Sequence, residues 1–407
     1  MKKFLIKRVE TLKKNRKENS KRERSTSSSE DKSVQLINKK QKRKNEEYIL
    51  LSDGESDESS DFNETNDLEV ISTSKEIKFF KNITQDSYTY RLGNNTFSVF
   101  KSFNNNIIYL IYVNKNHSII SYNLMNQKKL NEIRNAHQRH ITCINYYFDK
   151  IHLSDLIISI SGHDNNVKIW NPYNWICLLN LKNINEYGDL YSSCMLYDKK
   201  SNQNYVLTSN CYGNSEPIKI YDMKGRKIKE MKSSKENIIF MDIYYERNKY
   251  KNYILTGNEG YVKSYDFNNN KVYNKYWDND YRSHYNIIIN DYKSVVKLIE
   301  SSEDGNIRIW NFHSRELLKK INASDRGVYG ICLWDPENLF VGCEDKNIKL
   351  INLKNGKIIK ILNGHKNRVI NIKKIIIPKY GECLISQGDF EEKIKLWINK
   401  KSLKNNF

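Results

Sequence analysis

The feature that most constrains this chain is a strand ending that recurs seven times at a nearly constant interval. In each copy, a short apolar run ends in a large aromatic or aliphatic residue that is followed closely by Asn or Asp. These large residues are Tyr122, Trp170, Tyr221, Tyr265, Trp310, Ile351 and Trp397. Successive copies are 48, 51, 44, 45, 41 and 46 residues apart. A strand-containing repeat of about 40 to 50 residues is typical of a β-propeller, whose small sheets stack around an axis and bury one another's faces. We therefore predict an all-β fold, a seven-bladed β-propeller.

Three repeats also carry an aspartate in a tight turn, six residues before the closing residue. These aspartates are Asp164, Asp304 and Asp345. The last repeat begins with Gly364-His365. With these features the chain resembles the WD40 family over roughly residues 85–400. The resemblance implies that the turn aspartate and the histidine belong to a buried hydrogen-bond network that ties the loops to the sheet.

Some repeats depart from this pattern. The first Gly-His position reads Ala136-His137, and the third and fourth repeats have Ser215 and Glu259 where the turn aspartate is expected. These departures weaken individual blades and leave the period intact. We predict that the tryptophans at strand ends are buried structural residues rather than ligand contacts: Trp170, Trp310 and Trp397.

The repeats place the propeller at residues 76–400, followed by a short tail at residues 401–407. Only ten residues follow Trp397, and they show no strand pattern, so the seventh blade lacks its outermost strand. Before the first full repeat there are two strand-like segments, at residues 76–80 and 88–92. We expect one of them to pair with blade seven, because this pairing closes the ring and covers an open sheet edge.

Residues 1–75 do not have the composition of a folded domain. Residues 1–50 carry 17 Lys or Arg against 7 acidic residues, whereas residues 51–69 carry eight acids and no base. Blocks of like charge bury too little apolar area to offset the loss of chain entropy on folding. We therefore predict a disordered tail that is first basic and then acidic.

The tail holds two short motifs. A basic cluster resembles a nuclear localisation signal, which favours the nucleus over the cytoplasm. It consists of Lys39, Lys40, Lys42, Arg43 and Lys44. An apolar run beside the acidic stretch resembles a SUMO-interacting motif, which adds a strand to an open sheet edge. It consists of Ile49, Leu50 and Leu51. Chance is the alternative for both, because basic clusters arise easily in a lysine-rich chain and four apolar residues near acids also arise by chance.

Several function classes find no support in the sequence. No apolar run approaches the roughly 18 residues of a membrane-spanning helix, so we expect no membrane insertion. The motifs of hydrolases, nucleotide-binding loops and metalloproteases are missing, so we expect no enzyme, no cofactor and no metal site. His137 and His140 are three residues apart, but a propeller loop histidine is favoured over a zinc ligand. The seven cysteines are scattered, and we expect most of them in the core.

Charge gives two further observations. The chain has a formal net charge of +20, of which +16 falls in residues 83–407. Six closing strands have a cation two residues before the large residue: Lys168, Lys219, Lys263, Arg308, Lys349 and Lys395. A phosphate-binding ladder is one interpretation. The favoured interpretation is that the aliphatic part of each side chain lies along the neighbouring blade, with its charged group in water.

Arginine is scarce, with only ten copies after residue 82. Four of these ten lie in the loops that enter a blade from the previous one: Arg139, Arg282, Arg326 and Arg368. Arginine binds carboxylate and phosphate through a bidentate fork, which lysine cannot form. We predict that these four residues share one face and bind an acidic ligand. The alternative is that exposed loops are simply often charged.

These features predict a non-enzymatic protein-interaction scaffold that docks an acidic or phosphorylated peptide or protein subunit. The alternative is a propeller associated with RNA or ribonucleoprotein, as in nuclear RNA processing or ribosome assembly, because a basic surface attracts phosphate. A substrate receptor of a cullin ubiquitin ligase is less favoured. Such a receptor needs Trp-Asp-x-Arg at a strand end, and the nearest match, residues 221–224, ends in lysine.

Overall fold

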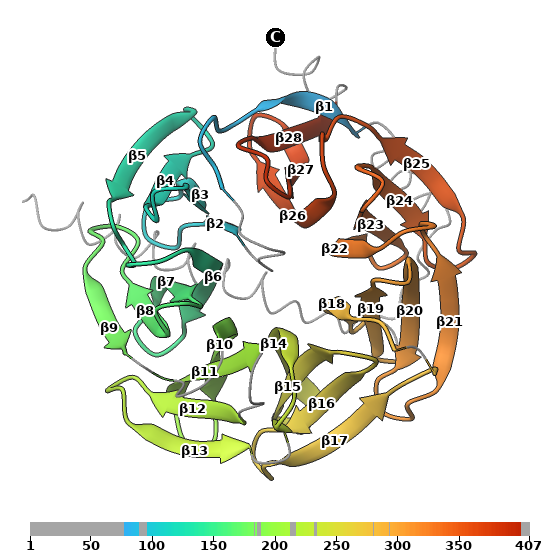
Figure 1. Ribbon diagram of the computed structural model, residues 1–407, viewed down its shortest axis with the longest axis horizontal. Helices are drawn as coiled ribbons and strands as arrows, with labels where there is room; N and C mark the ends of the chain where they lie inside the picture. The colour runs from blue at the N-terminus through green and yellow to red at the C-terminus, as the bar shows by residue number, and fades with distance from the viewer. Residues whose placement is uncertain are drawn as a thin grey trace, which may run out of the picture. The chain divides into compact units, whose positions relative to one another are not determined.

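The computed structural model describes residues 77–88, 96–182, 184, 189–211, 217–231, 234–279, 281–292 and 294–399. The predicted tail with its two motifs, the C-terminal residues 401–407 and Ser215 lie outside the described residues. The described strands form seven four-stranded antiparallel sheets arranged in a ring (Figure 1). The prediction of an all-β, seven-bladed propeller is therefore confirmed.

Six blades are continuous in sequence, and each runs from its innermost to its outermost strand. Blade one comprises β2 (Phe97–Lys101), β3 (Ile108–Val113), β4 (Ile119–Asn123) and β5 (Lys128–Ile133). Blade two comprises β6 (Ile141–Asp149), β7 (Ser154–Ser161), β8 (Asn166–Trp170) and β9 (Cys177–Leu181). Blade three comprises β10 (Asp189–Asp198), β11 (Gln203–Cys211), β12 (Ile218–Asp222) and β13 (Lys227–Met231). Blade four comprises β14 (Ile238–Glu246), β15 (Lys251–Asn258), β16 (Val262–Asp266) and β17 (Lys271–Tyr276). Blade five comprises β18 (His284–Asn290), β19 (Lys297–Ser302), β20 (Asn306–Asn311) and β21 (Leu317–Asn322). Blade six comprises β22 (Val328–Asp335), β23 (Asn338–Cys343), β24 (Ile348–Asn352) and β25 (Ile358–Leu362).

Blade seven is assembled from both ends of the domain. It comprises β26 (Val369–Ile377), β27 (Gly381–Gly388), β28 (Ile394–Asn399) and, as its outermost strand, β1 (Ile77–Asn82). β1 runs antiparallel to β28, with Ile77 opposite Asn399 and Phe79 opposite Trp397. The rings of Phe79 and Trp397 meet edge to face, with centroids 5.5 Å apart. The predicted closure of the ring is confirmed, and the first of the two candidate segments provides it.

The position of a strand in its blade explains its residue pattern. β3 and β23 are buried along their whole length, because neighbouring blades cover both of their faces. Their sequences are therefore almost continuously apolar, as expected for fully buried strands. The outer strands β5 and β9 are largely exposed; β5 carries four polar residues, whereas β9 remains mostly apolar.

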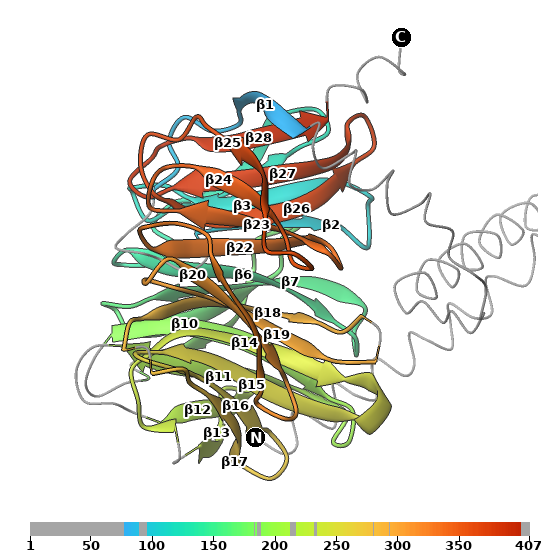
Figure 2. The ribbon, with the colours of Figure 1, turned by 90° about the vertical axis from the view of Figure 1, so that its right-hand side faces the viewer.

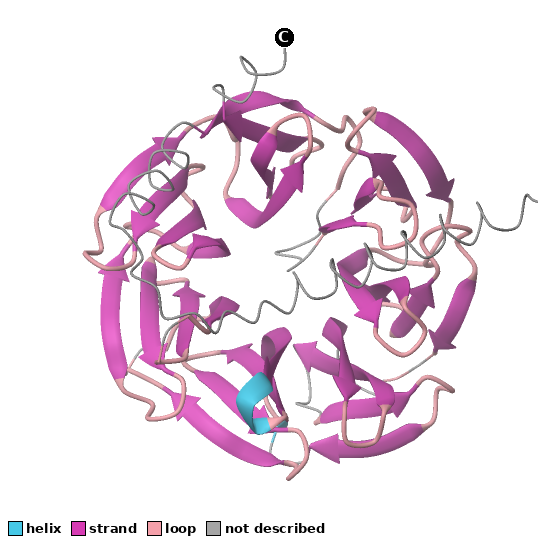
Figure 3. Ribbon diagram, turned by 180° about the vertical axis from the view of Figure 1, so that it is seen from behind, coloured by secondary structure: helices cyan, strands magenta, loops and turns pink. Residues whose placement is uncertain are grey.

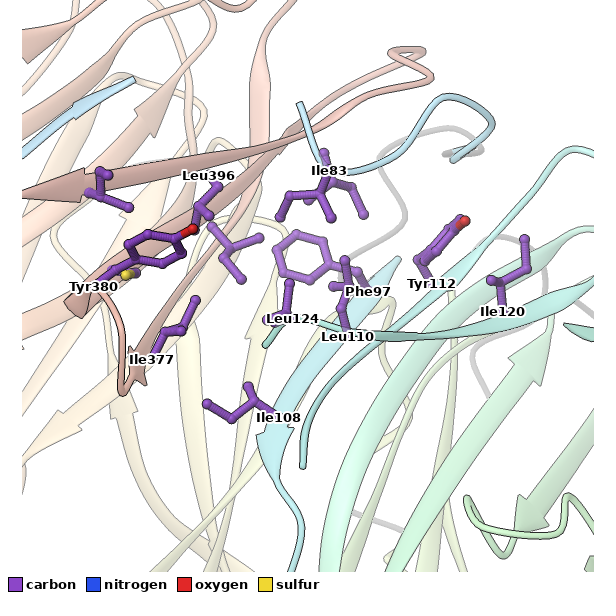
Figure 4. Close-up of a cluster of buried hydrophobic side chains, with 14 residues drawn as sticks. Ile83, Phe97, Ile108, Leu110, Tyr112, Ile120, Leu124, Ile377, Tyr380 and Leu396 are labelled. Atoms are coloured by element: carbon purple, nitrogen blue, oxygen red, sulfur yellow. The ribbon is translucent and has the colours of Figure 1, made fainter. Parts of the chain in front are cut away.

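The hydrophobic core is divided among the junctions between blades, whose sheets stack face to face when the ring is seen from the side (Figure 2). Figure 4 shows the junction of blades seven and one, where Phe97 and Leu110 pack with Ile377, Tyr380 and Leu396. Because β1 also leads into this junction through Ile83, ring closure and core packing depend on each other.

Regular structure outside the strands is sparse. The described residues contain one 3-10 turn, η2 (Arg247–Lys249), and otherwise strands and connections (Figure 3). Within the described residues, no helix has the length and apolar character that a bilayer crossing demands. Five of the six cysteines whose burial is described lie in the core, and Cys177 is exposed on β9. Burial raises the pKa of the Cys143 thiol to about 12, so this thiol is un-ionised at neutral pH.

Candidate interaction rim

The connections between strands divide the ring into two rims. Neighbouring strands in a blade are antiparallel, so all innermost strands begin at the same rim. We call this the upper rim. It holds the connections that enter each blade from the previous one and the turns between the second and third strands. The lower rim holds the connections between the first and second strands and between the third and fourth strands.

In several blades, hydrogen bonds tie the entering connection of the upper rim to the turn of the same blade. In blade two the backbone N–H of Gln138 donates to Asp164 at 3.1 Å. In blade six the N–H of Glu344 donates to the carbonyl of Gly327 at 2.8 Å, and in blade seven the N–H of Asp389 donates to the carbonyl of Arg368 at 2.8 Å. The loops of this rim are therefore held on a rigid frame.

Blade two contains a buried network that fixes the loop before β6. The Ser159 hydroxyl accepts a hydrogen bond from Trp170 Nε1 at 2.8 Å and lies 2.8 Å from His137 Nε2. His137 Nδ1 lies 3.4 Å from Asp164 Oδ2. Burial lowers the pKa of His137, so its imidazole is neutral near pH 7. Burial opposes ionisation of Asp164, but hydrogen bonds from His137 and the backbone outweigh it and lower the pKa of this carboxyl.

Blade seven repeats the network with one change. The Ser386 hydroxyl lies 2.7 Å from His365 Nε2 and accepts a hydrogen bond from Trp397 Nε1 at 2.7 Å. The partner of His365 Nδ1 is Glu391 Oε2, at 2.9 Å, in place of an aspartate. Glu391 was not predicted from the sequence, although it stands six residues before Trp397 as the turn aspartates do before their closing residues. The two serines, which both lie eleven residues before the tryptophan of their blade, were not predicted either.

Blade five builds the equivalent region from charged residues. In blades two and seven, a serine on the second strand lies opposite a lysine on the third strand. Glu300 and Arg308 take these two positions in blade five. Glu300 Oε2 lies 2.7 Å from His284 Nδ1, and Glu300 Oε1 accepts a bond from Trp310 Nε1 at 3.4 Å. Both Glu300 and Arg308 are fully buried.

Two more carboxylates complete the charged cluster of blade five. Arg308 contacts Asp304 through Nη2 at 2.5 Å and Asp278 through Nε at 2.8 Å. Burial works against ionisation of Asp304, but the hydrogen bonds from Arg308 and Asn306 prevail and lower the pKa of Asp304 to about 2. The turn aspartate is therefore occupied by structure and is not available to a ligand.

The remaining repeat residues also have structural surroundings. Tyr221 and Tyr265 are buried, whereas Tyr122 is half-buried and donates its hydroxyl hydrogen to the Gln127 carbonyl at 2.7 Å. Asp345 accepts the backbone N–H of Asn347 at 3.1 Å and lies 2.7 Å from Lys349 Nζ. No group of three His, Cys, Asp or Glu side chains that could hold a metal occurs among the described residues.

The cations of the closing strands correct one interpretation from the sequence. The ammonium groups of Lys168, Lys219 and Lys349 bind protein acceptors and are not left to water alone. Each donates to a backbone carbonyl in the connection that enters its own blade, and the acceptors are Ala136 at 2.6 Å, Ile184 at 2.7 Å and Ala323 at 2.9 Å. A carbonyl in a tightly packed loop needs a donor, and the lysine supplies it. These cations therefore fasten loops to blades.

The four predicted arginines lie in connections of the upper rim. Arg139 enters blade two, Arg282 blade five, Arg326 blade six and Arg368 blade seven. Arg139 and Arg326 are exposed, and their guanidinium groups form no ion pair with any residue that the structure describes. Arg282 is also exposed.

Arg368 differs from the other three arginines. Its Nε and Nη2 atoms bind Oδ2 of the buried Asp389 at 2.7 and 2.6 Å. Its guanidinium also lies 5.3 Å from the centroid of the Tyr329 ring. The guanidinium of Arg368 thus already holds the turn of blade seven, and Arg139 and Arg326 are the exposed arginines of the four that form no ion pair with a described residue.

The upper rim also exposes aromatic residues that the sequence analysis did not single out. Trp277 and Tyr281 lie in the connection from β17 to β18, and Phe390 lies in the turn from β27 to β28. The sequence gives no signal for Trp277, because Trp175 and Trp334 also lie outside the register shared by Trp170, Trp310 and Trp397 and are buried.

Comparison with known proteins identifies the repeat. The family model "WD domain, G-beta repeat" matches residues 128–171, which contain β5 to β8. A "Putative BTB/POZ domain and WD-repeat protein R61" of Acanthamoeba polyphaga mimivirus is 28% identical over 118 residues, which is 29% of this chain and 23% of that protein. A "U3 small nucleolar RNA-associated protein 21 homolog" of Schizosaccharomyces pombe is 26% identical over 72 residues, which is 18% of this chain and 8% of that protein. The matches thus span less than a quarter of either relative.

Proposed function

Because the chain is a WD40-repeat protein whose seven blades close into one propeller, we propose that it is an interaction scaffold that binds an acidic or phosphorylated peptide at its upper rim. WD40 propellers are typical protein-interaction scaffolds, and the upper rim offers loops held on a rigid frame. The observation that carries the proposal is the exposure of Arg139 and Arg326, whose guanidinium groups are not paired with any described residue.

The arginines have the chemistry that this ligand requires. A guanidinium binds a carboxylate or a phosphate through two parallel hydrogen bonds, which fixes orientation as well as charge. Arg282 and Arg326 enter neighbouring blades, and Arg139 enters blade two on the other side of blades seven and one. An extended acidic segment can therefore contact the rim at more than one blade.

The test is a titration of the full-length protein with a labelled peptide of residues 50–70, whose stretch from residue 51 to 69 has eight acids and no base. Arg326→Ala should weaken binding by about 1.5–3 kcal/mol for each charged hydrogen bond lost. Arg326→Lys should restore only part of the loss, because lysine cannot form the fork. Arg315, which is exposed on the lower rim, provides the matched control, and Arg315→Ala should bind as wild type does. Equal affinity of the wild-type and Arg326→Ala proteins would refute the proposal.

A second candidate function is association with a ribonucleoprotein. The relative named as U3 small nucleolar RNA-associated favours this candidate, as does the net charge of +16 in residues 83–407. RNA binding should weaken steeply with salt, because each phosphate contact releases counterions. A binding constant that hardly changes between low and physiological salt would argue against direct contact with RNA.

We also propose a nuclear location, which the basic cluster Lys39 to Lys44 supports. A fluorescent fusion of the full chain should accumulate in the nucleus. A variant with Lys42, Arg43 and Lys44 replaced by Ala should lose that accumulation, and an unchanged distribution would contradict the proposal.

A further inference from the structure

We propose that Trp277 and Tyr281, on the upper rim between blades four and five, form a platform on which bases of single-stranded RNA stack. The side chains are 47% and 81% exposed. Their ring centroids are 6.5 Å apart, and the ring planes are inclined by 73°. Both side chains are thus accessible to solvent from one connection, β17 to β18.

Trp277 is an exception among the tryptophans of this chain. The other five are at most 8% exposed, and all six belong to the described residues. An exposed indole forgoes the burial free energy that a large aromatic ring ordinarily contributes. Trp277 therefore contributes less to packing than Trp310 and Trp397 do.

Positive charge lies directly beside the rings. Lys275 Nζ is 3.9 Å from the centroid of the Tyr261 ring and 5.5 Å from that of Trp277. Arg282 follows Tyr281 in the same connection and is exposed. Proteins that bind single strands combine such cations, which contact the phosphates, with aromatic faces on which the bases stack.

Two of the acids near the rings, Asp278 and Glu236, are already paired with cations. Asp278 binds Arg308 Nε at 2.8 Å and Lys320 Nζ at 2.9 Å. Glu236 is paired with Lys263. Burial disfavours the charged form of Asp278, but Arg308 and Lys320 outweigh it and lower the pKa of this carboxyl. Asp278 is therefore an ionised carboxylate paired with both cations. These acids therefore do not repel a phosphate that approaches Lys275.

The surroundings of the rings favour RNA over a protein partner. A protein interface needs an apolar centre, but among the described residues the upper rim exposes one other large hydrophobic side chain, Phe390 in blade seven. Stacking needs unpaired bases, and RNA presents these in its loops and ends. The proposal rests on the ribonucleoprotein candidate and gives it a direct contact, and it does not depend on peptide binding by the arginines.

The experiment uses full-length protein and a fluorescein-labelled polyuridine RNA of about 12 nucleotides, within the range of single-strand site sizes. Trp277→Ala and Tyr281→Ala should each weaken binding about fivefold or more, as expected when one stacked base is lost. Trp277→Phe should retain most of the affinity, because it keeps an aromatic face. Tyr250 gives the matched control: it is 64% exposed on the lower rim with Lys199 Nζ 4.3 Å from its ring centroid, and Tyr250→Ala should bind as wild type does.

Tryptophan fluorescence gives a second readout. Because Trp277 is the solvent-exposed tryptophan of the six, RNA should quench the long-wavelength emission of wild type. That change should be missing from Trp277→Phe even though this variant still binds RNA. Thermal unfolding of each variant shows whether it is folded, and if Trp277→Ala fails to fold, Tyr281→Ala decides.

Four results would overturn the stacking site. Two concern affinity: wild type and the folded ring variants bind RNA equally well, or the protein binds single-stranded and duplex RNA equally well. The other two are an RNA titration that leaves the Trp277 emission unchanged, and a Trp277→Ala variant whose affinity for the acidic peptide falls as much as its affinity for RNA. Recovery of RNA-containing particles from cells by wild type and Trp277→Ala alike would leave the ribonucleoprotein candidate intact and remove the direct contact.

Discussion

Replacing Glu300 with serine should destabilise the protein by about 3–5 kcal/mol, because the change removes one partner of a buried ion pair. Glu300 and Arg308 have no exposed surface, and Arg308 Nε lies 3.7 Å from Glu300 Oε1. The variant also leaves His284 and Trp310 without the carboxylate that they contact. Arg308 keeps Asp304 and Asp278 as counter-charges, so the loss should fall near the lower end of the range.

The double variant Glu300→Ser with Arg308→Lys tests the physical reason for that loss. It places serine opposite lysine at the register where blade seven has Ser386 opposite Lys395. A serine does not need a buried counter-charge, and the lysine can reach the carbonyl of its own entering loop. The double variant should therefore be more stable than the sum of the single changes indicates, with a coupling free energy of about 0.5–3 kcal/mol.

Urea unfolding of wild type, both single variants and the double variant, followed by circular dichroism, gives the four free energies. The control is Glu303→Ser, a half-buried acid in the turn of the same blade, which should change stability by less than about 0.5 kcal/mol. A cost below about 1 kcal/mol for Glu300→Ser, or strict additivity in the double variant, would refute the account of blade five as a charge-coupled network.

Three further predictions concern the ring and its histidines. Trp397→Ala should cost about 3–5 kcal/mol in chemical unfolding, and a folded variant of unchanged stability that fails only in binding would contradict a structural role. Removal of residues 1–95 deletes β1 and should make the protein insoluble or strongly destabilised, because the edge of β28 is then unpaired. If its unfolding midpoint equals that of a protein starting at residue 75, ring closure by β1 is not needed for stability. Burial lowers the pKa of His137 and His365 below the ordinary value of 6.5, so the unfolded chain binds more protons below that pH. Stability should therefore decrease as pH falls below about 6.5, and His365→Gln should make the urea midpoint less sensitive to pH between about 7.5 and 5.5.

The fold could be predicted because the same strand ending occurs in every repeat. Each blade needs a large residue at the end of its third strand, so seven copies reveal the period even when single blades depart from the pattern. The closing strand could be predicted because the residues after Trp397 show no strand pattern, which left β28 of blade seven without an outer partner. Such arguments concern backbone pairing, which sequence patterns report well.

The interaction rim was less predictable because side-chain partners depend on strand register and loop geometry. The sequence around Ser159 does not distinguish it from other serines. Its hydroxyl reaches Trp170 Nε1 only through the pairing of β7 with β8. Lys168 was assigned to solvent because the nearby carbonyl that it binds belongs to a loop 32 residues away. Trp277 was missed because the composition of its connection does not show that its ring faces outward.

The pairing of β1 with β28 has a consequence for how the chain folds during synthesis. β1 emerges from the ribosome first, and its partner follows roughly 320 residues later, which is about 16–64 seconds at 5–20 residues per second. Joining ends so far apart costs about 3 kcal/mol more chain entropy than closing a connection of about ten residues. Blades one to six can form locally as they are made, so the ring is sealed last. Throughout that interval β1 is available to another copy of the chain, and exchange of β1 between two copies is the misassembly that this architecture invites.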